Sequence, residues 1–179
     1  MYHLKPHRLN GPQFQGILGT EPNCTQCPLR FKRKVLPNGP VPAKIAIVAE
    51  GPGKQEELKG IGLCGPSGRL LWEDLGSTIG LHRQSVWVSN AHLCRPCKVR
   101  LSSNVVLDME EVKRQATACC RIRLLSELAA VDPVVIIPLG AFALQSIQGF
   151  HKASIYAYRG SIMETNIHDV YYKALHGLE

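Results

Sequence analysis

Four short apolar runs recur along the chain. Each is rich in β-branched or aromatic residues, a pattern typical of strands that are buried on both faces of a parallel sheet. The predicted strands are residues 44–49, 85–89, 134–138 and 170–175. Together they would form one central sheet.

Amphipathic stretches between these runs predict helices. One spans residues 67–79, where leucine and isoleucine recur at helical spacing. A second begins near Asp108, which forms a D-x-x-E variant of the capping box with Glu111, and a third follows Gly140. This alternation predicts an α/β protein, a three-layer α/β/α sandwich around a central, mostly parallel four-stranded sheet.

Polar side chains follow three of the four predicted strands. Glu50 comes after the first strand, Asn90 after the second and His176 after the fourth. Because ligands bind at the carboxyl ends of strands in such sheets, we expect these three residues to lie together. Taken on their own, Asn90 is more typical of a turn-forming residue, and His176 is more typical of a solvated terminal histidine.

The size and composition fit one compact domain, residues 1–179, of which 45% are hydrophobic. No apolar run reaches the length of about 18–20 residues that a membrane span needs. The N-terminal stretch lacks the apolar region of a secretory signal. We therefore expect a soluble, cytoplasmic protein.

The charge of the chain suits a polyanionic partner. The formal net charge is +7 and the sequence pI about 9.2, although many soluble domains are mildly basic. Basic residues concentrate in two stretches, residues 30–34 and 95–100, and both lie close to cysteines.

Seven cysteines in a chain with no export signal argue against a disulfide framework. They occur as Cys24-x-x-Cys27, Cys94-x-x-Cys97, the pair Cys119-Cys120, and Cys64. Four thiolates could hold zinc or an iron–sulfur cluster, and the spacing alone leaves both open. Incidental core cysteines are the remaining alternative.

Three motifs together resemble the iron–sulfur, family 4-like branch of the uracil-DNA glycosylase superfamily. They are C-x-x-C-P-L at 24–29, A-E-G-P-G at 49–53 and N-x-x-x-C-R-P at 90–96. The resemblance implies a 4Fe-4S cluster held by Cys24, Cys27, Cys94 and Cys120. Cys120 is preferred to Cys119 because the residues after it continue the family's C-x-x-x-L pattern.

The same resemblance implies where the cluster and DNA would lie. Residues 1–42 would form a cluster-binding N-terminal segment, and the cluster would be structural. It would present Arg95, Lys98 and Arg100 to DNA phosphates. The chain would lack the family's C-terminal loop and helix.

The implied activity is hydrolysis of the N-glycosidic bond of deoxyuridine in DNA, the first step of base excision repair. Glu50 would orient the attacking water, Asn90 would read the uracil edge and His176 would donate to a uracil oxygen. Four further residues would line the pocket: Gly51, Gly53, Glu56 and Leu63.

Three departures from the family pattern keep a second hypothesis open. Leu63 stands where the family has a stacking aromatic residue, Gly177 follows His176 where the family has proline, and the family's C-terminal loop and helix would be absent. The alternative is a weak or inactive glycosylase-like module that binds DNA or docks within a larger replication or repair protein.

Overall fold

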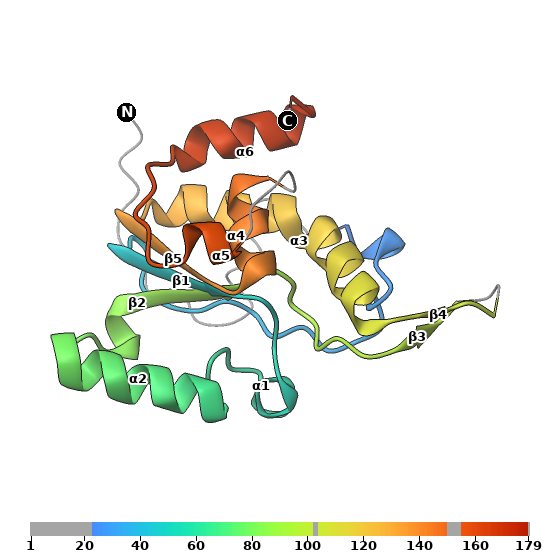
Figure 1. The fold of residues 1–179 in the computed structure, drawn as a ribbon, viewed down its shortest axis with the longest axis horizontal. Coiled ribbons are helices and arrows are strands. Elements are labelled where there is room, and N and C mark those ends of the chain that lie inside the picture. Colours follow the sequence, from blue (N-terminus) through green and yellow to red (C-terminus); the bar gives the residue numbers. More distant parts are fainter. Residues whose placement is uncertain (1–22, 102–103, 150–154, 179) are drawn as a thin grey trace.

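Three parallel strands form the central sheet of the computed structural model, which describes residues 23–101, 104–149 and 155–178 (Figure 1). The strands are β1 (Ile45–Ala49), β2 (Val86–Asn90) and β5 (Val135–Leu139), in the order β2-β1-β5. Each lies within one residue of a predicted strand, so the mixed α/β architecture and three of the four strands are confirmed.

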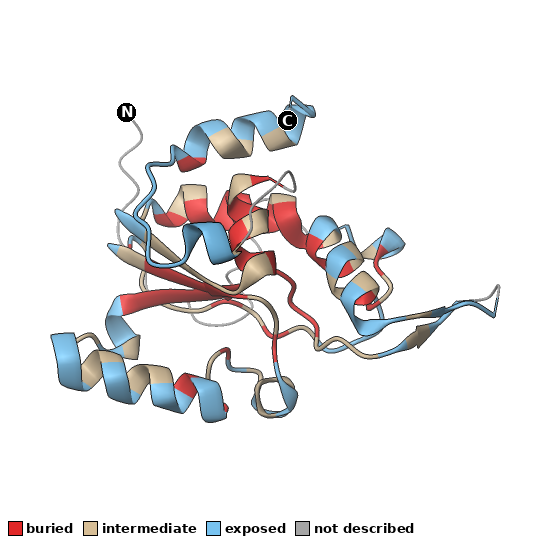
Figure 2. Cartoon of the chain, viewed as in Figure 1, coloured by how far each residue is buried: buried red, intermediate tan, exposed pale blue. Residues whose placement is uncertain are grey.

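Helices cover both faces of this sheet (Figure 1). On one face α2 (Pro66–Ile79) packs against Ile47. On the other face Ala46 and Val48 pack against apolar residues of the remaining large helices. These are α3 (Met109–Val131), α4 (Ala141–Gln148) and α6 (Ile167–His176). Successive side chains of β1 thus pack on opposite faces of the sheet, and this is the burial on both faces that the apolar runs predict. Figure 2 shows the buried residues gathered between the layers.

The predicted fourth strand, residues 170–175, is wrong because this stretch belongs to helix α6. The Asn166 side chain caps the helix by accepting from the backbone N–H groups of His168 and Asp169, both at 3.2 Å. Ile167, Val170, Tyr171 and Ala174 then pack on the same core cluster, a helical spacing. Among the described residues β5 is therefore an edge strand.

Helix α3 begins as predicted. The Asp108 carboxylate accepts from the backbone N–H of Glu111 at 2.8 Å. The Glu111 side chain does not complete the capping box and binds Arg114 instead, with Nη2–Oε1 at 2.6 Å. The helix runs for 23 residues and carries Cys120 into the protein interior.

The segment before β1 runs antiparallel to β2 along its outer edge. Val35 N–H donates to the Leu93 carbonyl at 2.8 Å, and Asn38 exchanges two hydrogen bonds with Val88, at 2.8 and 3.0 Å. This pairing brings the 3-10 turn Cys24–Gln26 to the side of the molecule where the chain leaves β2.

The smaller elements lie outside this frame. They are α1 (Lys54–Lys59), the 3-10 turn Arg83–Ser85, β3 (Val99–Arg100), β4 (Val106–Leu107) and α5 (Ile155–Tyr158). Strands β3 and β4 pair as an antiparallel hairpin that projects from the body (Figure 1). None of the helices in the described ranges has the length and apolar character needed to cross a membrane.

Candidate active site and cysteine cluster

The register of the sheet brings Glu50 and Asn90 to one edge. Ala49 pairs with Asn90 on β2 and with Leu139 on β5, so all three strands end at the same level. The chain continues in step beyond the strands, because Ala91 N–H donates to the Ala49 carbonyl at 2.8 Å and His92 N–H to the Glu50 carbonyl at 3.1 Å. Two of the three predicted strand-end residues are therefore neighbours.

The Glu50 carboxylate is held by groups from α3 and α4. Lys113 Nζ lies 3.6 Å from Oε2, and the Phe142 N–H, at the start of α4, points to Oε1 at 3.4 Å. Gly140 is required here, because a Cβ at this position would lie 2.4 Å from Glu50 Oε1. The Glu50 side chain keeps 31% of its surface exposed, so the held carboxylate can still reach a ligand.

A glycine-rich loop faces Asn90. Asn90 is 3% exposed, and its Nδ2 would lie 3.5 Å from a Cβ on Gly62. The next residue, Leu63, has φ +50°, a conformation that costs a non-glycine residue energy. Its carbonyl accepts from Trp72 Nε1 at 3.0 Å and lies against Gly68, where a Cβ would come within 2.1 Å. Such maintained strain is typical of functional sites.

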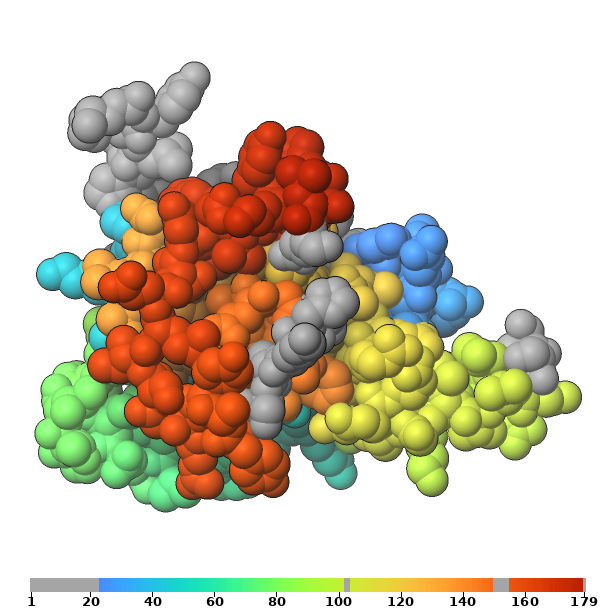
Figure 3. All heavy atoms as spheres, turned by 45° about the horizontal axis from the view of Figure 1, so that its top comes forward, coloured from blue at the N-terminus to red at the C-terminus, as the bar shows by residue number. Residues whose placement is uncertain are grey.

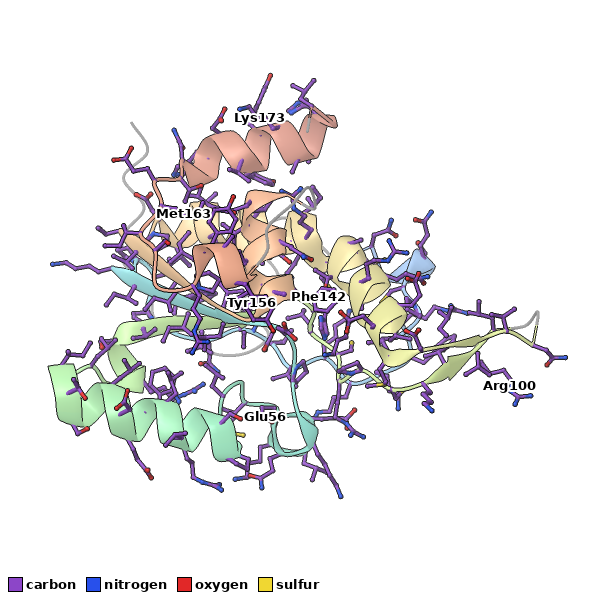
Figure 4. All side chains as sticks on the ribbon, in the orientation of Figure 1. Glu56, Arg100, Phe142, Tyr156, Met163 and Lys173 are labelled. Atoms are coloured by element: carbon purple, nitrogen blue, oxygen red, sulfur yellow. The ribbon has the colours of Figure 1, made fainter. Side chains whose placement is uncertain are left out.

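Glu56 closes this loop and is not free in the pocket. Its Oε1 accepts from the Gly65 N–H at 2.6 Å, and its Oε2 would lie 2.7 Å from a Cβ on Gly53. Glu56 therefore shapes the pocket by fixing the turn before α2. Figure 4 labels it between the ribbons of α1 and α2.

The turn after β1 rests on a histidine that the sequence analysis did not single out. His92 is 1% exposed, and a Cβ on Gly51 would lie only 2.0 Å from its Nε2. Its Nδ1 lies 3.1 Å from Thr117 Oγ1. Burial, with the nearby charges of Lys113 and Arg123, lowers the pKa of His92 to about 4, so the imidazole is neutral at pH 7.

His176 does not join this group of residues. It ends the surface helix α6, its side chain is exposed, and its Nδ1 lies 2.8 Å from the carbonyl of Tyr172. Helix α6 packs mainly on α3 and α4. The prediction that His176 lies beside Glu50 and Asn90 depended on the missing fourth strand and is wrong for this structure.

Five thiols line one small cavity next to this site. They belong to Cys24, Cys27, Cys94, Cys119 and Cys120. Burial, together with the neighbouring thiols, raises the pKa of Cys27 to about 12 and that of Cys94 to about 11. Convergent, unbonded sulfurs from three separate segments are the donor set that a metal–thiolate group requires.

Cys119 and Cys120 differ in burial within this cavity, since Cys120 is buried and Cys119 half-buried. The Cys120 thiol raises the pKa of both Cys27 and Cys94, and the Cys119 thiol raises that of Cys27. Neither Cys97 nor Cys64 lines the cavity. Within the described ranges, no three Cys, His, Asp or Glu side chains meet closely enough to surround a single metal ion.

The predicted phosphate-binding residues differ in availability. Arg95 Nε is paired with Glu57 Oε2 at 2.7 Å, which ties the cysteine segment to α1. Lys98 and Arg100 are exposed, and Arg100 lies on the β3–β4 hairpin (Figure 4). In the space-filling view of Figure 3 the hairpin projects from the body on the same side as the segment of Cys24.

Comparison with known proteins gives one consistent result. The sequence model of the Uracil DNA glycosylase superfamily matches residues 36–176. The chain is similar to Type-4 uracil-DNA glycosylases of Thermotoga maritima (34% identity over 77% of this chain and 67% of the relative). It is also similar to those of Archaeoglobus fulgidus (39%, over 70% and 58%) and Pyrobaculum aerophilum (31%, over 70% and 59%). The chain thus spans about three fifths to two thirds of these relatives' lengths.

Proposed function

Because the chain belongs to the uracil DNA glycosylase superfamily, we propose that it hydrolyses the N-glycosidic bond of deoxyuridine in DNA. The observation that carries the proposal is the meeting of Glu50 and Asn90 at one sheet edge, opposite the strained Leu63 loop. Enzymes that act on a base in DNA extrude it from the stack into such a pocket.

Each pocket residue would have a separate role in base excision. Asn90 carries both an amide donor and a carbonyl acceptor, so it can pair with the edge of uracil and discriminate against cytosine. Glu50 would orient a water molecule toward the sugar carbon, with its carboxylate held by Lys113 and the Phe142 N–H. Gly51 and Gly53 let the turn after β1 pack against His92 and Glu56, and Leu63 would pack on the base.

Asn90→Asp is expected to weaken uracil recognition because a carboxylate cannot donate to the uracil carbonyl. Loss of one such hydrogen bond, with a buried group left unpaired, corresponds to about tenfold or more in KM for a deoxyuridine oligonucleotide. The matched control is Asn166→Asp, because aspartate also caps a helix. Equal KM values for the Asn90→Asp variant and the wild type would exclude the base-reading role.

His176→Ala is expected to leave excision within about twofold of the wild-type rate, as for other surface substitutions of about 0.5 kcal/mol. The reason is its position at the exposed end of α6. Initial rates on the same oligonucleotide measure this. A hundredfold loss with an unchanged melting temperature would instead restore the catalytic role that the sequence suggests.

We further propose that Cys24, Cys27, Cys94 and Cys120 hold a 4Fe-4S cluster. Four thiolates hold such a cluster, and these four line one cavity from three separate segments of the chain. When bound, the group would cross-link the segment before β1 to α3. Lys98 and Arg100 would then meet DNA phosphates beside it.

The test of this function is excision from oligonucleotides that carry one deoxyuridine, followed by alkaline cleavage of the abasic site. Oligonucleotides with thymidine or deoxycytidine at that position are the controls. Cleavage restricted to the deoxyuridine strand is expected. Binding of all three oligonucleotides without cleavage would support the alternative, a DNA-binding module. The aliphatic side chain of Leu63 favours this alternative.

A further inference from the structure

A buried ion pair lies beneath the end of β2. Arg123 and Glu127, one turn apart on α3, are 4% and 0% exposed. Arg123 Nη1 donates to Glu127 Oε1 at 2.5 Å and to Ser89 Oγ at 3.1 Å. Ser89 Oγ in turn donates to Glu127 Oε2 at 2.7 Å. Removing one partner would leave the other as an unpaired buried charge. The role of the pair therefore follows from the groups that it holds in place.

The second amino group of Arg123 holds the backbone of the base-reading residue. Its Nη2 donates to the carbonyl of Asn90 at 2.8 Å and to that of Ala91 at 3.3 Å. These carbonyls lie where β2 ends and the chain turns toward Cys94. Arg123 therefore fixes the peptide from which the Asn90 side chain extends.

The remaining N–H of Arg123 is on Nε, and the Cys120 thiol interacts with this guanidinium. Its Nε is buried and has no hydrogen-bond acceptor in the part of the chain that the structure describes. Cys120 lies three residues earlier, on the same face of α3. Burial lowers the pKa of Arg123, but the charge of Glu127 and the Cys120 thiol raise it by more. The net shift of the pKa is upward, so the guanidinium is charged. A thiolate at Cys120 would supply the acceptor that a buried N–H needs.

We propose that Arg123 is a positioning residue that joins the cysteine cluster to the base-reading asparagine. With the cluster bound, Nε–H donates to the Cys120 thiolate while Nη2 holds the Asn90 carbonyl. This inference rests on the proposed ligand and base-reading roles of those two residues. It predicts that a change at Arg123 alters both the cluster and the recognition of uracil, although Arg123 touches no substrate.

The test compares Arg123→Lys with Arg121→Lys in the cluster-loaded protein. Lysine keeps the charge that Glu127 needs but cannot reach Asn90 and Cys120 together. Arg121 is a matched buried arginine on α3 whose Nε donates to the Ser146 carbonyl at 2.9 Å. The first readout is the reduction potential of the cluster, which hydrogen bonds to its sulfurs set. The second is KM against kcat for a deoxyuridine oligonucleotide.

Arg123→Lys is expected to lower the potential and to raise KM about tenfold, with a smaller change in kcat, as for the loss of one charge-assisted hydrogen bond. Arg121→Lys should change neither. If Arg123→Lys does not fold, the double variant Arg123→Gln with Glu127→Gln is used in its place, because it removes both buried charges. A wild-type potential in the variant that folds would overturn the proposal. The potential needs no excision, so this outcome is distinct from failure of the proposed glycosylase activity.

Discussion

Glu50→Gln is expected to lower the rate of uracil excision by a factor of about 10²–10⁴, the usual contribution of a general base. Glutamine keeps the shape of the side chain and its contact with the Phe142 N–H, but it cannot accept a proton from water. The loss should appear in kcat, since the base is read by Asn90. Single-turnover rates on a deoxyuridine oligonucleotide measure it.

The control for this substitution is Glu73→Gln, because Glu73 is an exposed glutamate on α2. It should excise uracil at the wild-type rate. Equal rates for the Glu50 variant and the wild type would show that Glu50 is not the general base. The neighbouring Lys113 would then be the next residue to test.

Cys120→Ala is expected to abolish the visible absorption of the purified protein and to lower its stability. A group that binds only the folded state stabilises it by about 4 kcal/mol when present at a thousand times its dissociation constant. Loss of the cluster should therefore separate the segment of Cys24 from α3 and lower the melting temperature. The absorption spectrum and iron content give the first result, and thermal unfolding gives the second.

Cys119→Ala and Cys97→Ala are the matched controls. Cys119 lines the same cavity and Cys97 lies outside it, so both variants should keep the spectrum. A colourless Cys119→Ala variant and a brown Cys120→Ala variant would show that Cys119, and not Cys120, is the fourth ligand. A zinc-containing, colourless wild type would contradict the cluster altogether.

The sequence predicts the part of the fold that depends on local pattern. The strands that end at Ala49, Asn90 and Leu139 are apolar on both faces, and the helix after Asp108 carries its own cap. Residues 170–175 mislead because Val170 and the two tyrosines favour a strand, whereas the Asn166 cap and the apolar spacing from Ile167 favour a helix. Tertiary packing on α3 decides between the two.

The candidate site divides in the same way. Glu50 and Asn90 can be found because strand ends meet in a parallel sheet, whatever surrounds them. Lys113, His92 and Arg123 cannot, because their roles arise where α3 crosses the strand ends. An arginine and a glutamate four residues apart, such as Arg123 and Glu127, are typical of a solvated helix face, and only the structure shows them to be buried.

Release of free uracil is the most direct measurement of the central claim. The cluster-loaded protein would be mixed in excess with an oligonucleotide that carries one deoxyuridine, and uracil would be quantified by mass spectrometry. We predict about one uracil per oligonucleotide, with none from the Glu50→Gln variant on the same time scale. No uracil from a folded, iron-containing wild type would contradict the glycosylase account.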